Sequence, residues 1–432
     1  MKIVFYSTNS NAFNNETFII KVKPSNESSF QAFVNQHPEH EFLCISQAPA
    51  MFMPEKSVIL LEQNLTAQQF AQEILKYKPD FAIAMSFWVN PYDWLTVNDA
   101  MVAEELKKAG VKTVCHSVET GLVCFDKWRT HQKLLQLGFN VPKALFVDHD
   151  LYFCAGSHKE VLNNVYKASV ASQLEDLNLP LIIKDTAGLR SYGMTVVNTY
   201  GEARCYLNSK RNNSNRIVEE YITGEQFGTE IYGVPGNYKV MPLLRFSLNQ
   251  YGITSPKQSA KKGPVELEPE LENTLLQLAK ALGFQGCAQV DLIKSDGKWY
   301  IIEINPRLSG MSFSYATLNN LSIFELLCQS SLAQYLPEFK NNSFLCLTSL
   351  VQLLNVKLPL LGEEMMDKVL GISGVQLLNQ TNDLAAKQER EKGFCECIVT
   401  ADSSEGIKEA LNQIKALFPG EATILQSETI LK

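Results

Sequence analysis

Short apolar runs alternate with helical patterns over the first part of the chain. Apolar residues at helical spacing predict helices at Ala67–Tyr77 and Asn98–Ala109, and Thr66 with Gln69 forms a capping-box pattern at the start of the first helix. Strands are predicted at Lys2–Tyr6, Glu41–Ser46, Phe81–Met85 and Val111–Cys115. Because strands and helices alternate at this spacing, we expect a parallel sheet with crossover helices, in an α/β domain over residues 1–118.

The rest of the chain is patterned differently. A helix is expected from Asp126, as its N-cap, to Leu137, and four leucines spaced four, three and four residues apart predict another that ends at Gly283. Apolar runs predict strands at Leu181–Ile183, Met194–Val197, Ile217–Tyr221, Phe227–Tyr232, Cys287–Ile293 and Trp299–Ile304. Further on, a helix is expected at Ile323–Tyr335 and a strand followed by a helix within residues 394–418.

The last two strands of the central part predict a β-hairpin with a distinctive set of polar residues. Asp291 lies on its first strand, and Glu303 and Asn305 lie two apart on the second, so that they share a face. Oxygen ligands of this kind suit Mg²⁺ or Mn²⁺. The alternative is an ordinary hairpin with surface charges, but Glu303 interrupts an apolar run, where an unpaired carboxylate would be costly. Arg307, two residues further on, has the planar fork that binds an anion through two hydrogen bonds.

A second polar pattern follows the strand at residues 181–183. Lys184 ends that strand and is followed by a turn rich in glycine, serine and threonine. Backbone N–H groups of such a turn approach phosphates closely, and the lysine adds a fixed positive charge. A glycine-rich turn alone is weak support, since many hairpins contain one.

Composition and charge restrict the class of protein. With 432 residues, 45% hydrophobic and 20% charged, the chain is expected to form more than one globular domain. A net charge of −7 argues against general nucleic-acid binding, which needs a basic face. The start of the sequence lacks the pattern of a signal peptide, and no run approaches the roughly 20 apolar residues of a membrane span. The ten cysteines are scattered without a CxxC pair, which predicts reduced thiols and a cytoplasmic protein.

Several chemistries lack their residues. The six histidines all precede residue 159, so the hairpin region has no histidine base or histidine-rich metal site of its own. The sequence contains no GxSxG, HExxH, GxxxxGK[ST] or GxGxxG motif. These absences argue against serine-hydrolase, zinc-hydrolase, Walker-type and Rossmann-cofactor functions.

Four segments follow one another along the chain: DKWRTHQKLLQLGFNVP (126–142), LPLIIKDTAGLRSYGM (179–194), VEEYITGEQ (218–226) and EINPRLSG (303–310). In this order they resemble the ATP-grasp superfamily, and the resemblance covers roughly residues 1–340. The resemblance implies an ATP-grasp fold of α/β and α+β class. An N-terminal parallel α/β domain would span residues 1–118. The ATP-grasp domain would span residues 119–340, with a nucleotide cleft between two α+β subdomains and a lid-like subdomain at 143–222. A small C-terminal closing subdomain would span residues 341–432.

The resemblance also implies a role for individual residues. Arg307 would be catalytic and steady the acyl-phosphate or tetrahedral species, and Asp291, Glu303 and Asn305 would hold Mg²⁺ or Mn²⁺. The ATP-binding residues would be the phosphate-contacting Lys127 and Lys184, the phosphate-covering loop with Gly188, Ser191 and Gly193, the adenine hinge formed by Glu219, Glu220, Tyr221 and Ile222, and the ribose-binding Glu225.

The function implied is that of an ATP-dependent carboxylate–amine ligase, forming ADP and phosphate and acting on small molecules, one of them an amino acid. The L-amino-acid ligases, carbamoyl phosphate synthetases and biotin carboxylases are the types it resembles. Asp291 precedes Glu303 by twelve residues, a spacing that resembles biotin carboxylase as much as the peptide-forming ligases, yet EINPRLSG lacks the acidic residue that carboxylases carry after the arginine. A bicarbonate-activating enzyme and a non-catalytic ATP-binding protein are the alternatives. No nucleic-acid or membrane partner is expected, and a homodimer is left open.

Overall fold

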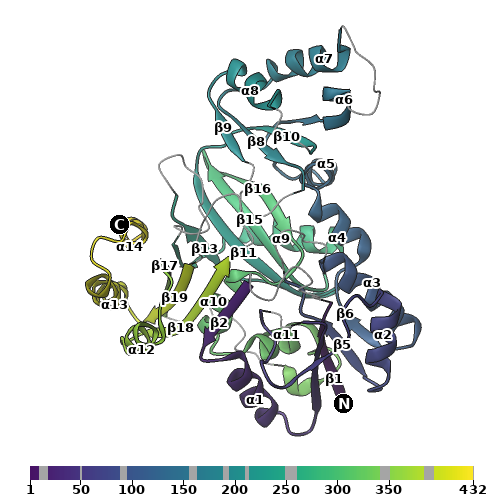
Figure 1. Ribbon diagram of the computed structural model, residues 1–432, viewed down its shortest axis with the longest axis vertical. Coiled ribbons are helices and arrows are strands. Elements are labelled where there is room, and N and C mark those ends of the chain that lie inside the picture. Colours follow the sequence, from purple (N-terminus) through teal and green to yellow (C-terminus); the bar gives the residue numbers. More distant parts are fainter. Residues whose placement is uncertain are drawn as a thin grey trace. The chain divides into compact units, whose positions relative to one another are not determined.

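The computed structural model describes residues 1–8, 18–48, 51–87, 95–154, 163–187, 194–209, 214–248, 260–340, 351–383 and 394–431 (Figure 1). The chain divides into two compact units. The first unit comprises residues 1–122, 226–290 and 305–432, and the second comprises residues 123–225 and 291–304. The division into three domains near residues 118 and 340 stays a prediction.

A parallel sheet forms the N-terminal part of the first unit. Its strand order is β4-β3-β1-β5-β6, and all four neighbouring pairs run parallel. The strands are β1 (Lys2–Ser7), β3 (Glu41–Ser46), β4 (Val58–Leu60), β5 (Phe81–Ala84) and β6 (Lys112–Val114). The predicted α/β arrangement is therefore confirmed, with β4 as an additional edge strand.

Helices cover both faces of this sheet. On one face lie α2 (Ala67–Leu75) and α3 (Leu95–Lys108), where Phe70 packs in one core with Tyr6 of β1. On the other face lies α1 (Asn26–Gln36), which the sequence analysis did not predict and whose Phe33 packs against Phe5. The predicted capping box of α2 is present, because the Thr66 hydroxyl accepts from the Gln69 N–H at 3.2 Å and the Gln69 side chain accepts from the Thr66 N–H at 2.9 Å.

A ten-stranded sheet is the larger framework. Its order is β16-β15-β11-β13-β14-β17-β19-β18-β2, with β12 paired to β11, and the boundary between the units falls within β15 and β16. The strands are β2 (Phe18–Lys23), β11 (Glu225–Val234), β12 (Asn237–Val240), β13 (Leu243–Phe246), β14 (Lys261–Val265), β15 (Gly286–Ser295), β16 (Lys298–Asn305), β17 (Gln352–Leu358), β18 (Val375–Asp383) and β19 (Phe394–Ala401). Figure 1 shows β2, in purple, beside the yellow-green β18.

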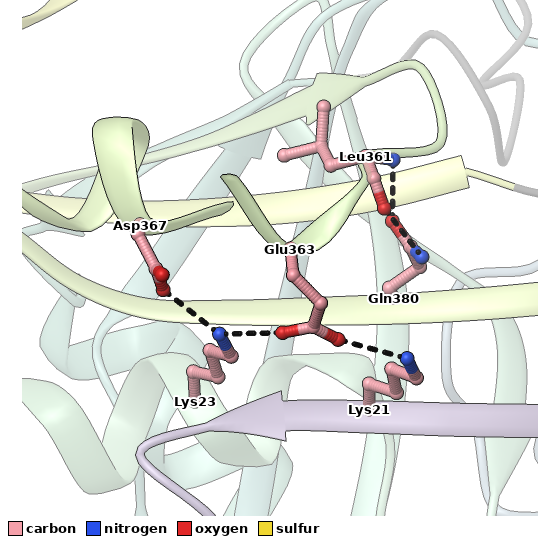
Figure 2. A network of polar contacts seen from close by, with 6 residues as sticks. All are labelled: Lys21, Lys23, Leu361, Glu363, Asp367 and Gln380. Carbon is pink, nitrogen blue, oxygen red and sulfur yellow. Dashed lines mark hydrogen bonds and ion pairs between the residues drawn. The ribbon is translucent and has the colours of Figure 1, made fainter. Parts of the chain in front are cut away.

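Strand β2 joins an early segment of the chain to a late one. Its register pairs Val22 with Asn379 of β18, and Val22 is buried. Lys21 and Lys23 point to the other face of the strand, where both contact Glu363 at the start of α12 (Glu363–Leu370) (Figure 2). This edge strand was not predicted from the sequence.

The remaining helices of the first unit pack on its sheets. Helices α12, α13 and α14 share a core with one face of β17, β18 and β19. Helix α9 ends at Gly283, as predicted, since this residue has a φ of 61° and caps the helix in the left-handed conformation. These helices are α9 (Pro269–Leu282), α10 (Gly310–Leu318), α11 (Ile323–Ser331), α13 (Ser404–Leu417) and α14 (Ala422–Thr429), with a 3-10 turn η1 (Pro337–Phe339). Helix α4 (Val118–Phe125) crosses the boundary between the units.

The second unit contains an antiparallel sheet of order β7-β10-β8-β9. Its strands are β7 (Ala144–Val147), β8 (Leu181–Asp185), β9 (Thr195–Val197) and β10 (Arg216–Glu220), and its helices are α5 (Lys127–Gln136), α6 (His149–Phe153), α7 (Val165–Leu174) and α8 (Tyr200–Leu207). One apolar core joins Leu145, Leu174, Ile183 and Val218. Within the described residues, no helix is long and apolar enough to cross a membrane.

Candidate functional site

Lys127 and Glu303, predicted respectively for phosphate and metal binding, contact each other in the second unit. Asp126 caps α5 by accepting from the N–H groups of Trp128 and Arg129, so that Lys127 becomes its first residue. The Lys127 Nζ lies 3.0 Å from the Glu303 Oε1, with 17% and 32% of the two side chains exposed. The pair is therefore held within the protein but remains accessible to water.

Lys184 and Glu219, both also singled out by the sequence, form a second and more buried ion pair. Lys184 on β8 lies directly opposite Ile217 on β10, and Glu219 follows two residues later, so both side chains share a face of the sheet. The Lys184 Nζ lies 2.5 Å from the Glu219 Oε2, and only 8% and 7% of their side chains are exposed. Neither partner can lose the other without leaving a charge poorly solvated.

His131 lies next to this buried pair and was not singled out by the sequence analysis. It is buried on α5 and stacks on Trp128, with ring centroids 5.4 Å apart. Burial lowers the pKa of His131, and the charge of Lys184 adds to this lowering while that of Glu219 opposes it. The imidazole is therefore favoured in its neutral form. Spacing along α5, four residues after Lys127, was the one available signal for it.

The segment after β10 contains the predicted adenine hinge. The Glu220 N–H donates to the Lys143 carbonyl and the Tyr221 N–H to the Pro180 carbonyl, each at 2.9 Å. The Glu220 carboxylate accepts two hydrogen bonds from Asn178, also at 2.9 Å. These bonds fix the backbone immediately before Ile222.

Glycine is required where the hinge turns into β11. A Cβ atom on Gly224 would collide with the carbonyl oxygen of Lys294 on β15, so only a bare backbone fits there. The predicted ribose-binding Glu225 is exposed at the first position of β11. The sequence VEEYITGEQ thus corresponds to a fixed strand end, a close backbone contact and an exposed carboxylate.

The hairpin carries its predicted residues on neighbouring strands. Asp291 lies on β15 and Glu303 on β16, both partly exposed, and Asn305 is the last residue of β16. The Asn305 Oδ1 accepts from the Arg307 Nη2 at 3.2 Å. Arg307 is 7% exposed, and its Nη1 donates to the Leu308 carbonyl at 3.2 Å. The side chain of the predicted catalytic arginine is therefore held in one orientation.

A buried carboxylate that the sequence analysis missed supports the segment after Arg307. Glu230 of β11 is fully buried and accepts hydrogen bonds of 2.7 Å from Tyr232, Ser309 and Ser312. Burial raises the pKa of Glu230, and the three hydroxyl donors partly offset the rise. The two serines lie at the start of α10, so Glu230 fixes the beginning of this helix.

Part of the predicted site lies outside the described residues. Gly188, Ser191 and Gly193 fall within residues 188–193, which the structure does not describe. The same holds for residues 88–94 and 249–259.

Comparison with known proteins gives a family match over much of this region. Residues 124–311 match the ATP-grasp domain family. The chain is 29% identical over 152 residues to a D-alanine–D-alanine ligase of Methylibium petroleiphilum, covering 32% of this chain and 48% of that protein. It is 26% identical over 226 residues to a D-alanine–D-alanine ligase of Neisseria meningitidis, covering 50% of this chain and 68% of that protein.

Solved structures resemble nearly the whole chain. N5-carboxyaminoimidazole ribonucleotide synthetase of Thermus thermophilus superposes with a TM-score of 0.64 at 15% identity, covering 98% of this chain and 100% of that one. L-amino acid ligase of Bacillus licheniformis gives a TM-score of 0.63 at 15% identity, covering 96% and 97%. The biotin carboxylase domain of Hydrogenobacter thermophilus 2-oxoglutarate carboxylase, solved with MgADP and bicarbonate, gives a TM-score of 0.60 at 12% identity, covering 96% and 88%.

The fold, the order of the motifs and the matched domain identify the class. Residues 124–311 carry an ATP-grasp domain. The predicted superfamily and fold class are therefore confirmed. The match spans about half of the Methylibium ligase, and the structural likeness at 12–15% identity defines the fold alone.

Proposed function

We propose that this protein is an ATP-dependent carboxylate–amine ligase. It transfers the γ-phosphate of ATP to a carboxylate, and an amine then displaces phosphate from the acyl phosphate, leaving an amide or peptide bond, ADP and phosphate. One substrate is an amino acid. The observation that carries the proposal is the contact of Lys127 with Glu303 inside the ATP-grasp domain, because it unites a phosphate-binding cation and a metal-binding carboxylate.

The two lysines bind the phosphates of ATP. Each lysine is paired with a carboxylate in the structure, Lys127 with Glu303 and Lys184 with Glu219. Phosphate oxygens accept charge-assisted hydrogen bonds from ammonium groups as carboxylates do, so the nucleotide can take the place of a carboxylate partner. This exchange is easier at Lys127, whose pair is more exposed. Phosphoryl transfer needs such placed charge more than covalent chemistry by the protein.

The hairpin suits Mg²⁺ or Mn²⁺. Asp291 and Glu303 offer carboxylate oxygens and Asn305 an amide oxygen, a donor set typical of these ions together with water and substrate phosphates. When bound, the ion would neutralise charge on the phosphates. Glu303 is held by Lys127 and Asn305 by Arg307, so both ligands have partners that keep them in place.

Arg307 stabilises the reacting carboxylate. Its guanidinium is buried and fixed by Asn305 and by the Leu308 carbonyl, so it is oriented before the substrate arrives. A fixed cation of this kind favours the charge that develops on the acyl phosphate and the tetrahedral species. The hinge from Glu219 to Ile222 holds adenine through backbone groups, and Glu225 holds the ribose hydroxyls.

The test is the release of ADP and phosphate from MgATP in the presence of pairs of L-amino acids. We expect at least one pair to give ADP, phosphate and a new product whose mass is that of an amide. Glu303→Ala is expected to abolish this turnover and to melt close to the parent. Asp296→Asn is the matched control, because it removes an exposed carboxylate from the turn of the same hairpin.

Three results would contradict the proposal. Near-normal turnover in Glu303→Ala would remove the metal assignment. Turnover that depends on bicarbonate and not on an amine would favour the carboxylase alternative. Nucleotide binding without turnover for any amino-acid pair would favour a non-catalytic ATP-binding protein.

Location and assembly complete the proposal. The nine cysteines in the described part of the chain carry free thiols, which suits the reducing cytoplasm where we place the protein. A homodimer is the assembly we would test by light scattering.

A further inference from the structure

A row of polar side chains crosses four strands of the ten-stranded sheet in the first unit. Lys261 of β14 lies opposite Asn355 of β17, and Lys357 follows Asn355 by two residues. Lys357 lies opposite Glu396 of β19, and Glu396 lies opposite Asn379 of β18. Directly opposed residues share a face of a sheet, as do residues two apart on a strand. These five side chains, called the polar row below, therefore lie on one face.

The polar row is buried although it consists of polar groups. Asn355 is 1% exposed and Asn379 is 2% exposed, and Lys357 and Glu396 are also buried. Residues between them in sequence, such as Val356 and Cys397, point to the other face and pack in the core with α12–α14. Burial of so many polar groups on one side of a sheet lowers stability unless each of them has a hydrogen-bond or ion-pair partner.

Two amides of the row lack the partners that buried groups ordinarily have. Among the residues that the structure describes, the Oδ1 of Asn379 has no hydrogen-bond partner, and neither polar atom of the Asn355 side chain has one of good geometry, although this amide lies close enough to Glu396 to lower the pKa of that carboxyl group. A buried side-chain amide without partners costs stability, and such groups are rare in native proteins. The row therefore contains buried amide groups whose hydrogen-bonding capacity is not fully used.

The charges of the row leave one cation in excess. Lys357 forms an ion pair with Glu396, and Lys261 lies 3.6 Å from the same carboxylate. Burial favours the neutral acid, but the charges of Lys357 and Lys261 outweigh it and lower the pKa of Glu396 to about 2. At neutral pH two lysines of the row thus face one carboxylate of the row. The charge of Lys261 also acts on the nearby Glu230, but burial favours the neutral form of this carboxyl group, so the row itself has one positive charge more than it has negative.

The beginning of α10 lies against the same groups. A Cβ atom on Gly310, the first residue of this nine-residue helix, would lie 3.8 Å from the Lys261 Nζ and 3.9 Å from the Glu396 Oε2. The N-terminal end of a helix favours an anion, which adds to the excess cation. Gly310 follows the predicted catalytic Arg307 by three residues, so the chain itself connects the row with the proposed chemistry.

We propose that the polar row binds the carboxylate of an amino-acid substrate of the ligase, with Lys261 as the cation that meets it and Asn355 as its hydrogen-bond donor. This inference rests on the proposed function for the identity of the substrate. One cation in excess matches the single charge of a carboxylate and not the nearly double charge of a phosphate ester. The ion pair of Lys357 with Glu396 keeps the neighbouring side chains of the row in position.

The test is direct binding of the L-amino acids to the full-length protein, each compared with its amide, in which the carboxylate is neutral. Isothermal titration gives the Kd, and MgATP is titrated separately. We expect at least one amino acid to bind more tightly than its amide. Lys261→Gln and Asn355→Ser are expected to raise its Kd about tenfold, as loss of a charge-assisted hydrogen bond implies, and to leave the Kd of MgATP unchanged.

Lys262→Gln is the matched control, because it removes the next lysine of β14, which points to the opposite face. A variant that melts well below the parent is set aside in favour of the other row variant, and Lys261→Gln is the milder change. The inference is wrong if no amino acid binds, if acid and amide bind equally, if a phosphate monoester such as glycerol phosphate binds more tightly, or if both row variants bind as the parent does. Failure of MgATP to bind would instead contradict the proposed function, so the two failures are distinguishable.

Discussion

Two groups of lysine–carboxylate pairs use the same chemistry in opposite surroundings. At the surface of the first unit, Lys21 and Lys23 each lie 2.9 Å from Glu363, and the three side chains are 30–62% exposed (Figure 2). Inside the second unit, Lys184 and Glu219 are 8% and 7% exposed. Water solvates the first group whether or not it is paired, whereas the members of the second depend on each other. The contribution of an ion pair to protein stability therefore cannot be judged from its contact distance alone, because it also depends on burial.

The pair of Lys127 with Glu303 lies between these extremes, at 17% and 32% exposure. Its partners can separate at moderate cost because water reaches both. A site that must exchange a carboxylate for a phosphate group needs this intermediate state. We therefore expect that removing a lysine lowers the stability of the protein most in the most buried group and least in the most exposed one.

The largest effect is expected from Lys184→Met. This change leaves the buried Glu219 carboxylate without its cation, and breaking such a pair costs about 4 kcal/mol of unfolding free energy. Urea denaturation measures the loss. The double variant Lys184→Met/Glu219→Leu is the control and should recover most of it, because an apolar pair needs no counter-charge. A single variant as stable as the parent would mean that water reaches Glu219.

The next effect concerns a buried carboxylate that has only neutral donors. Asp99 is fully buried and accepts from the Thr8 N–H, the Thr8 hydroxyl and the Ser86 hydroxyl. Burial raises the pKa of Asp99 to about 6, and these donors only partly oppose it. Below about pH 4 the group is protonated in both states. As pH rises from about 4 to 6, the unfolded state loses the proton first, so the folded state loses stability.

Asp99→Asn is expected to remove this dependence. The difference in unfolding free energy between parent and variant should change by roughly 3 kcal/mol between pH 4 and pH 7, to the disadvantage of the parent. Urea denaturation at several pH values measures it. A constant difference over this range would show that the pKa of Asp99 is not raised. The neutral donors would then stabilise the buried carboxylate as well as a cation does.

A smaller effect on stability is expected from Lys127→Ala. Removing a partly exposed ion pair costs about 1 kcal/mol or less, since water solvates the remaining Glu303. Its effect on nucleotide binding should be larger, because MgATP then lacks a cation for its phosphates. Thermal melting with and without MgATP measures both. Lys133→Ala on the same helix is the control, and equal losses of MgATP stabilisation in both variants would point to a diffuse basic surface.

The sequence predicted the local elements of the site well. The capping box of Thr66, the helix end at Gly283 and the strands that carry Lys184 and Glu303 follow from periodicity and turn residues alone. These features depend on neighbours in the chain, so a local pattern contains what is needed to predict them.

Features that depend on strand register were missed. The pairing of Lys184 with Glu219 needs the alignment of β8 with β10, and the polar row needs that of four strands. Strand β2 was missed because its partner β18 is far away in the sequence. Glu230 is different, since the rule that singled out Glu303, a carboxylate in an apolar run, applies equally to it.

The smallest effect is expected from Lys23→Gln at the surface network. The pKa of Glu363 is lowered to about 2, first by the hydrogen bond from Lys23 and then by that from Lys21. Because the folded pKa is depressed, any stabilisation is present above about pH 4.5 and is lost as pH falls towards 2.

Lys21 still pairs with Glu363 in the Lys23→Gln variant, and both groups are well hydrated. We expect a slightly lower melting temperature at low salt and neutral pH, and none of this difference at about 1 M salt, where charges are screened within about 3 Å. Lys368→Gln, on the exposed face of α12, is the control with a comparable surface pair. A salt-independent loss as large as that of Lys184→Met would show that β2 needs Lys23 to stay on the sheet, and that burial of Val22 is insufficient to hold this edge strand.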